Sequence, residues 1–292
     1  MAKEFTLKNP EVEAVVSEHG AELKSLKKNG KELMWQADPK YWGRTSPVLF
    51  PLVGNYFEKK SRSGDKVYEM GQHGFARDMD FELLEKTENS LLFELKDNEE
   101  SKKKYPFDFV LQIGYVLKGA ELEVKWTVKN PGSDDIFFSI GGHPAFNCDL
   151  NNAALKFSKD GVLLDTCIKA GIIAGDGSGC LSERVKAYAV DEGIMNLSDD
   201  LFKEDALIVE DRQADEVTLI DDKGADVLSV KFDAPLFGIW SPAGKHAPFV
   251  CIEPWYGRCD RVGFTGDISE REYGNKLAAG EEFAVSYTIC AL

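Results

Sequence analysis

Two histidines and one glutamate stand in irregular stretches of this sequence, rich in Gly and Pro, where a side chain can reach a ligand. His73 lies in "GQHGFARDMDF", His143 in "SIGGHPAFN" and Glu253 in "FVCIEPWYG". Glycine beside a polar residue lets the backbone approach a ligand closely, and proline fixes the local direction of the chain. A carboxylate and an imidazole facing one ligand can exchange protons with it, so these residues are candidates for general acid–base chemistry.

Aromatic residues accompany these polar side chains. Trp240 and Trp255 lie with Glu253 in the stretch 237–260, and "YWGRTSPVLFPLVGN" at 41–55 joins paired aromatics to Arg44. A sugar has apolar C–H faces that pack on aromatic rings, and its hydroxyl groups each need a polar partner when buried. The combination therefore favours a carbohydrate ligand.

Structural roles compete with these functional ones. His73, which sits between a glutamine and a glycine, could be a packed core residue, and Glu253 could pair with Arg258 or Arg261 to hold a loop. Cys251 comes two residues before Glu253 and shares its face in a strand. We expect Cys251 to pack in the core, because no nearby residue clearly activates a thiol.

Other chemistries find less support. His73, His143 and Glu253 could ligate zinc or iron on a β-scaffold. However, the two histidines are 70 residues apart, and the sequence contains no HxH or HxxxH pair. The GxSxG motif of hydrolases and the GxxxxGK[ST] phosphate loop are also missing from the sequence. We expect neither a metal nor a cofactor.

The elements that must position these residues are strands. Apolar residues occupy alternate positions in "YPFDFVLQIGYVLKG" and "ELEVKWTVKN", which predicts two strands joined by the turn "LKGAE". A second hairpin is expected in 216–232, with its bend at Asp222-Lys223-Gly224. Further strands are predicted in 4–9, 12–18, 21–35, 90–97 and 281–292.

Helical periodicity is scarce. The best short helix is "LSDDLFKED", with Ser198 as its N-cap, and the charged run 96–106 is expected to be a solvated loop. The regular spacing of strands and turns predicts an all-β fold, a large antiparallel β-sandwich or barrel. With no linker or internal repeat, residues 1–292 are expected to form a single domain.

Composition excludes some partners. The net charge of −15 disfavours binding to nucleic acid, whose phosphates are also negative. The sequence has no stretch of about eighteen apolar residues, so we expect no membrane span, and the N-terminus lacks the apolar region of a signal peptide. Six cysteines without a CxxC pair indicate reduced thiols and a cytoplasmic protein.

The strings "GRTSPVLFPLVGN", "QHGFAR", "GGHPAFN" and "CIEPWYG", in this order, resemble the aldose 1-epimerase (galactose mutarotase) superfamily, most closely its LacX-like branch. The resemblance implies a galactose mutarotase-like β-sandwich, called a supersandwich. It also implies a sugar pocket lined by His73 and His143 and completed by Glu253. The galactose-specific members carry an Asn-Arg pair where this chain has Asn55-Tyr56, so the identity of the sugar is left open.

The resemblance also suggests roles for individual residues in interconverting the α and β anomers of a hexose. Glu253 would be the base and His143 the acid. Binding of the sugar would fall to the remaining candidates, with either tryptophan stacking on the ring: His73, Arg44, Asp205, Arg77, Trp240 and Trp255.

Two alternatives to this activity stay open. Arg44 and Arg77 could clamp a phosphate, as in a hexose-6-phosphate 1-epimerase, because guanidinium groups match phosphate oxygens. The same fold could also serve a carbohydrate-binding protein without catalysis. In each case the expected partner is a small sugar, and the chain is expected to act as a monomer or homodimer.

Overall fold

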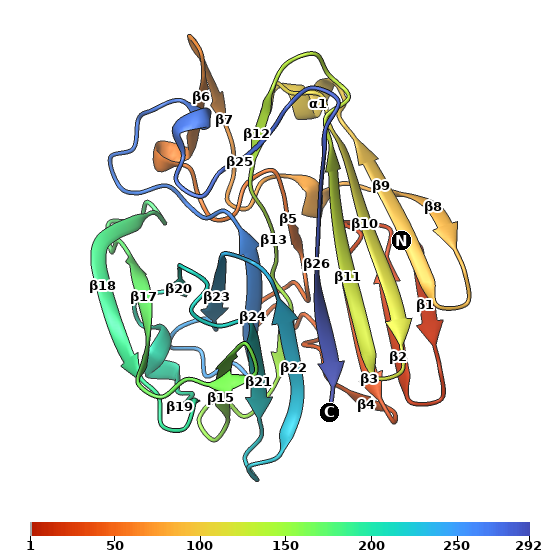
Figure 1. The fold of residues 1–292 in the computed structure, drawn as a ribbon, viewed down its shortest axis with the longest axis vertical. Coiled ribbons are helices and arrows are strands. Elements are labelled where there is room, and N and C mark those ends of the chain that lie inside the picture. The colour runs from red at the N-terminus through yellow and green to blue at the C-terminus, as the bar shows by residue number, and fades with distance from the viewer. Residues whose placement is uncertain (1) are drawn as a thin grey trace.

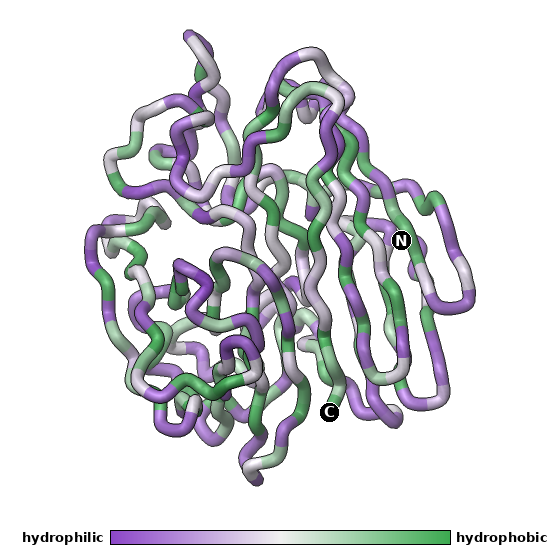
Figure 2. Tube along the Cα trace, in the orientation of Figure 1, coloured by the Kyte–Doolittle hydropathy of each residue, from purple (hydrophilic) through white to green (hydrophobic). Residues whose placement is uncertain are grey.

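The alternating residues of 105–130 form the antiparallel hairpin that the sequence predicts. The computed structural model describes residues 2–292. In it β10 (Val110–Lys118) pairs with β11 (Glu121–Lys129), and Ile113 lies opposite Trp126. Both side chains are buried, whereas Lys125 on the other face of β11 is exposed. Figure 2 shows hydrophobic and hydrophilic residues alternating along these long strands.

A large antiparallel sheet extends this hairpin on both sides (Figure 1). It includes the second expected hairpin, β21–β22. Within residues 2–292 its ten strands are, in spatial order, β16 (Val162–Leu163), β15 (Ala154–Lys159), β21 (Glu216–Ile220), β22 (Asp226–Phe232), β26 (Glu282–Ala291), β11, β10, β9 (Ser90–Lys96) and β8 (Glu82–Lys86), with β19 (Ile194–Asn196) paired to β15.

A second antiparallel sheet carries Trp240, Glu253 and Trp255, and one of its strands ends directly before His143. Among the described residues it has eight strands, in the order β18 (Leu181–Ala189), β17 (Cys167–Ile173), β20 (Leu207–Val209), β23 (Leu236–Trp240), β24 (Phe249–Tyr256), β13 (Ile140–Gly142) and β5 (Val48–Leu49), with β14 (Ala145–Asn147) paired to β24.

The N-terminal strands form a third sheet, and the remaining strands form two short two-stranded ribbons. The N-terminal sheet is β1 (Glu4–Lys8), β2 (Val12–Ser17), β3 (Leu23–Lys28) and β4 (Lys31–Glu32). The ribbons are β6 (Lys60–Ser63) with β7 (Lys66–Glu69), and β12 (Ile136–Phe138) with β25 (Asn275–Leu277).

One face of the ten-stranded sheet is covered by the other two large sheets. At one end, Phe5 of β1 packs edge-on against Phe93 of β9, with ring centroids 5.7 Å apart. Toward the other end, Phe232 of β22 lies 5.3 Å from Phe237 of β23. Buried apolar residues from all three sheets belong to one continuous core. The all-β, antiparallel sandwich that the sequence predicts is therefore confirmed.

Two local expectations need correction. The run 96–106 is not only a loop: it contains the α-helix α1 (Glu99–Lys102), because the Asn98 side chain accepts hydrogen bonds from the backbone N–H groups of Glu100 and Ser101. The expected helix after Ser198 is the 3₁₀ turn η3 (Asp199–Phe202), and the Ser198 side chain does not cap it. The other short 3₁₀ turns in residues 2–292 are η1 (Phe57–Lys59), η2 (Ala76–Asp78) and η4 (Ile268–Glu270).

None of the helices formed by residues 2–292 has the length and apolar character that crossing a lipid bilayer would require.

Candidate active site

A cavity of about 270 Å³ gathers most of the candidate residues. They come from segments far apart in the chain that meet beside β24 and β13. Seven of the eight predicted residues line it: His73, Arg77, His143, Asp205, Trp240, Glu253 and Trp255. Arg44 is not among the lining residues.

Glu253 is placed by the alternation of β24. Val250 and Ile252 point into the main core, so Cys251, Glu253 and Trp255 share the opposite face. The Glu253 side chain is 1% exposed, and neither carboxylate oxygen has a hydrogen-bond partner in the chain. A buried carboxylate without partners is costly in a folded protein, which is typical of a group kept for function.

The loop-holding role considered for Glu253 is wrong. Arg258 is buried and donates hydrogen bonds to Glu210 and Glu272, and Arg261 pairs with the same Glu272. These partners leave Glu253 free to face the cavity.

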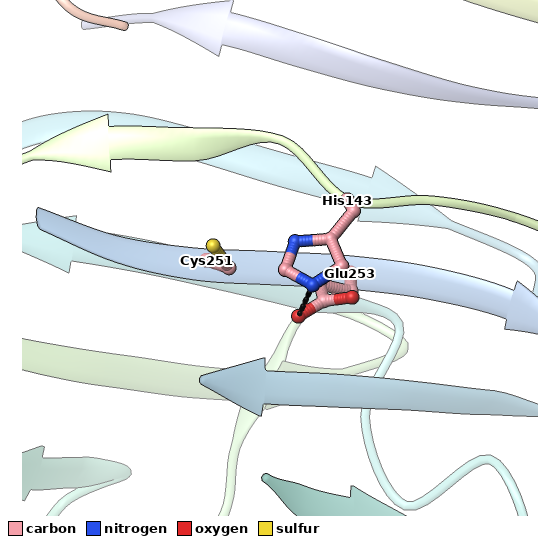
Figure 3. Close-up of side chains that lie close together, drawn as sticks. All are labelled: His143, Cys251 and Glu253. Atoms are coloured by element: carbon pink, nitrogen blue, oxygen red, sulfur yellow. Dashed lines mark ion pairs between the residues drawn. The ribbon is translucent and has the colours of Figure 1, made fainter. Parts of the chain in front are cut away.

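His143 follows β13 directly, and the two glycines before it allow tight packing there. A Cβ atom on Gly141 would lie 2.6 Å from the indole ring of Trp255, which is closer than real Cβ atoms approach. The backbone N–H of His143 donates to the carbonyl of Pro47. These contacts bring His143 Nε2 to 3.3 Å from Glu253 Oε1 (Figure 3).

His73 is held as a neutral hydrogen-bond donor. Its backbone N–H donates to the Gly54 carbonyl at 2.8 Å, and the Gly54 N–H donates to His73 Nδ1 at 3.0 Å. Because Nδ1 accepts, the ring proton resides on Nε2. His73 also has a backbone φ of 65°, which is rare for a residue other than glycine. The local backbone thus fixes both the direction and the tautomer of this imidazole.

Burial controls the protonation of the polar groups. It raises the pKa of Glu253 well above its usual value, and the nearby Trp255 indole N–H offsets this only partly. Burial also lowers the pKa of His143 to about 3 and that of His73 well below 6.5; the positive charges of Arg77 and Arg44 act in the same direction. Burial in the ligand-free pocket therefore favours neutral imidazoles and disfavours the charged carboxylate.

Arg77 and Arg44 share one carboxylate but differ in position. Arg77 lines the cavity, donates from Nη2 to the Gln72 carbonyl, and has a buried Nε without a hydrogen-bond partner. Arg44 donates from Nη2 to Asp78 at 2.7 Å. Asp78 also lies 3.8 Å from Arg77 Nε. Arg77 thus lines the cavity itself, whereas Arg44 lies outside the lining and is linked to Arg77 through Asp78.

Asp205 lies between the turn η3 and strand β20, ahead of a short apolar strand as the resemblance implies. It lines the cavity, and its charge contributes to the raised pKa of Glu253. One of its carboxylate oxygens accepts the N–H of Ala206, and the other is free of hydrogen bonds within the described residues.

Sequence reasoning missed Trp42. Its indole is stacked on the His143 ring, with centroids 4.7 Å apart and an interplanar angle of 29°, and it meets Trp240 edge-on. The paired aromatics Tyr41-Trp42 were a signal that could have singled it out. Ile173 and Gly179, which also line the cavity, come from β17 and the turn before β18, segments that none of the quoted motifs includes.

A group that could hold a metal also forms here, although the sequence led us to expect no metal, and its members differ from the set of His73, His143 and Glu253 considered above. His143, Cys251 and Glu253 offer ligand atoms that all lie within 4.8 Å of one another. His73 does not belong to this group. Cys251 packs among aromatic residues, as expected, yet its thiol lies beside the pair (Figure 3).

The fold and the pocket together define a class of protein: a large antiparallel β-sandwich with an imidazole–carboxylate pair in an aromatic-walled cavity. A family model described as aldose 1-epimerase matches residues 3–289. The chromosomally encoded protein LacX of Lactococcus lactis subsp. lactis is 32% identical over 300 residues, which cover 98% of each chain.

Two solved structures are also similar to this chain in sequence and in fold. A galactose mutarotase related enzyme from Lactobacillus acidophilus is 37% identical with a TM-score of 0.91, over 99% of this chain and 97% of that chain. A galactose mutarotase-like protein from Lactobacillus casei ATCC 334 is 30% identical with a TM-score of 0.91. The match covers 99% of this chain and 100% of that chain. The chain belongs to the aldose 1-epimerase family, and its similarity to LacX confirms the branch that the motifs indicate.

Proposed function

We propose that this protein is an aldose 1-epimerase, an isomerase that interconverts the α and β anomers of a hexose. The observation that carries the proposal is the contact of 3.3 Å between His143 Nε2 and Glu253 Oε1 in the cavity. Ring opening needs one group that takes a proton and one that gives a proton at neighbouring atoms of the sugar. A buried carboxylate beside an imidazole supplies both.

The reaction balances without any other reagent. Glu253 takes the proton of the C1 hydroxyl as His143 gives a proton to the ring oxygen, and the C1–O5 bond breaks. The aldehyde group then rotates about the C1–C2 bond. The ring oxygen attacks the other face of C1 and returns its proton to His143, while the new C1 alkoxide regains a proton from Glu253.

Burial decides which member of the pair more readily keeps a proton. It raises the pKa of the Glu253 carboxyl group and lowers the pKa of His143, so a proton on Glu253 is favoured over a proton on His143 in the ligand-free site. Moving the proton across the 3.3 Å contact gives the carboxylate base and the imidazolium acid. Sugar hydroxyl groups beside the pair favour this charged form, since they supply the hydrogen bonds that the pair otherwise lacks.

The surrounding residues would hold the sugar. His73 presents a fixed Nε2–H donor, Asp205 presents a carboxylate oxygen, and Arg77 presents an Nε–H that forms no hydrogen bond within the chain. Trp240 lines the same cavity and offers an apolar surface to the C–H face of the ring. Neither a metal nor a cofactor enters this scheme.

The direct test is the rate of anomer equilibration. Freshly dissolved α-glucose and α-galactose are followed by polarimetry or by NMR exchange, with and without the protein. Acceleration of either sugar supports the proposal. A protein that binds the sugars without accelerating exchange would instead be a carbohydrate-binding protein on the same fold, and the proposal would fail.

A hexose 6-phosphate is a second candidate substrate, favoured by the Nε of Arg77, which forms no hydrogen bond within the chain, and by the proximity of Arg44. Comparing glucose 6-phosphate with glucose separates the two substrates. If the phosphate binds Arg77, Arg77→Gln raises the KM for glucose 6-phosphate more than the KM for glucose. An equal effect on both sugars would assign Arg77 to a hydroxyl group instead.

We also propose that residues 1–292 form one catalytic domain and that the protein acts in the cytoplasm. All six cysteines, which lie within the described residues, are free thiols. Such thiols persist in a reducing compartment.

A further inference from the structure

Cys251 stands beside the His143–Glu253 pair, although the proposed reaction gives it no task. It precedes Glu253 by two residues on β24, so both side chains leave the same face of the strand. Its thiol is fully buried and lies with a His143 ring nitrogen and a Glu253 oxygen inside a span of 4.8 Å (Figure 3). A thiol, an imidazole and a carboxylate therefore converge on one point.

These three donors are the ligand types that zinc binds in proteins. In a tetrahedral zinc site, with bonds of about 2.0–2.3 Å, ligand atoms lie about 3.5 Å apart. The His143–Glu253 separation of 3.3 Å already matches this value, and the widest separation in the group, at most 4.8 Å, has to close by about 1 Å.

The polar atoms at this point lack partners. Both oxygens of Glu253 are buried and form no hydrogen bond within the chain. A metal ion would therefore satisfy buried polar atoms without breaking existing hydrogen bonds. His143 and Glu253 line the cavity, whereas Cys251 lies behind them, so an ion enters through the cavity and keeps its open coordination position on that side.

We propose that His143, Cys251 and Glu253 form a zinc site, and that zinc bound there inhibits the protein by occupying the sugar pocket. The binding stands on the geometry alone, whereas the inhibition rests on the proposed function. The bound ion takes the His143 nitrogen and the Glu253 oxygen that would otherwise exchange protons with the sugar. Binding forms Zn–N, Zn–S and Zn–O bonds to a neutral imidazole, a thiolate and a carboxylate, and any proton that the thiol or the carboxyl group carries is released to solvent.

The test uses the full-length protein, stripped of metal and free of any histidine tag. Zinc binding is measured by calorimetry and by metal analysis, and Co²⁺ is used as a spectroscopic probe for a thiolate ligand. We expect one zinc ion per chain and a thiolate-to-cobalt charge-transfer band. Cys251→Ala should weaken zinc binding at least about tenfold, since losing even an outer-shell partner of a metal costs 10–100-fold, and it should abolish the band.

Cys259→Ala is the matched control, because Cys259 is also buried and lines the same cavity. It should keep both the zinc affinity and the cobalt band. Zinc binding that survives Cys251→Ala, or a wild-type protein that binds no zinc at micromolar concentration, would overturn the proposed site.

Inhibition is measured separately, as the ratio of mutarotation rates with zinc and with a chelator for each variant. The ratio should be well below one for the wild type and for Cys259→Ala, and close to one for Cys251→Ala at the same zinc concentration. Zinc that binds through Cys251 without slowing mutarotation would refute the inhibition. If the protein has no mutarotase activity, the proposed function fails, while the cobalt and calorimetric results still decide the site.

Discussion

The indole of Trp42 lies flat against the imidazole of His143, with ring centroids 4.7 Å apart. Two contacts fix Trp42 in turn. Its backbone carbonyl accepts a hydrogen bond from the indole N–H of Trp35 at 2.8 Å, and the Trp240 ring packs edge-on against its indole. His143 therefore has an aromatic wall on one face and the Glu253 carboxylate at its Nε2. Trp42 is thus a positioning residue for the imidazole.

Replacing Trp42 by alanine should lower kcat for mutarotation by about 2- to 12-fold, because an aromatic contact of this kind is worth about 0.5–1.5 kcal/mol. Trp42→Phe keeps a flat ring and should recover most of the rate. Steady-state kinetics on both variants check this. A change in KM alone, with kcat unaffected, would show that Trp42 contacts only the sugar.

The proposed acid–base pair predicts a loss of activity without a loss of fold. Glu253→Gln and His143→Asn should each reduce the mutarotation rate by about 10²–10⁴-fold, the usual contribution of general acid–base catalysis. Circular dichroism and thermal unfolding establish that the variants are folded. Near-normal rates in both folded variants would remove the pair from the mechanism.

The buried state of His143 makes stability depend on pH. Its pKa is about 3 in the folded protein, below the ordinary histidine value of 6.5. Between these values the unfolded chain binds a proton that the folded chain does not, so the free energy of unfolding rises with pH. This stability is fully present above pH 6.5 and is lost as the pH falls toward 3.

Removing the imidazole should remove this contribution. The slope of the unfolding free energy against pH, between 3 and 6.5, should be smaller in His143→Asn by up to about 1.4 kcal/mol per pH unit. Urea denaturation at several pH values measures it. His246→Asn is the control, because His246 is exposed and lies outside the cavity. Equal slopes for wild type and His143→Asn would contradict a buried neutral imidazole.

The close approach of Gly141 to Trp255 predicts a steric effect. Gly141→Ala would place a Cβ atom 2.6 Å from the Trp255 ring, and overpacking of this kind costs about 1–3 kcal/mol. Chemical denaturation checks this against Gly175→Ala, whose new Cβ would meet nothing within 4 Å. A stability loss no larger than that of the control would mean that β13 and β24 are not packed so closely.

Much of the fold follows from local sequence. Alternation of apolar residues has a period of two in any strand, so the hairpins β10–β11 and β21–β22 could be predicted from short windows of sequence. The short helix α1 was missed because its stability comes from the Asn98 side chain rather than from an apolar face. Charge composition alone made this segment resemble a loop.

The candidate site was predicted only in part, because it is assembled from distant segments. Motif resemblance picked out His73, His143 and Glu253, each in an irregular stretch that interrupts the strand pattern. It did not show that Arg44 binds Asp78 outside the lining of the cavity, or that Trp42 covers His143. Nothing in a local window relates residues that are 34 or 101 positions apart, as these two pairs are.

The sequence by itself determined the strands, the antiparallel sandwich and the family, because strand alternation and the order of short motifs are written along the chain. The tertiary structure alone decided the pairing of His143 with Glu253, the tautomer of His73 and the place of Cys251 beside the pair. The physical reason is that these properties depend on burial and on the distance between side chains. Both are set only when β5, β13 and β24 come together in one sheet.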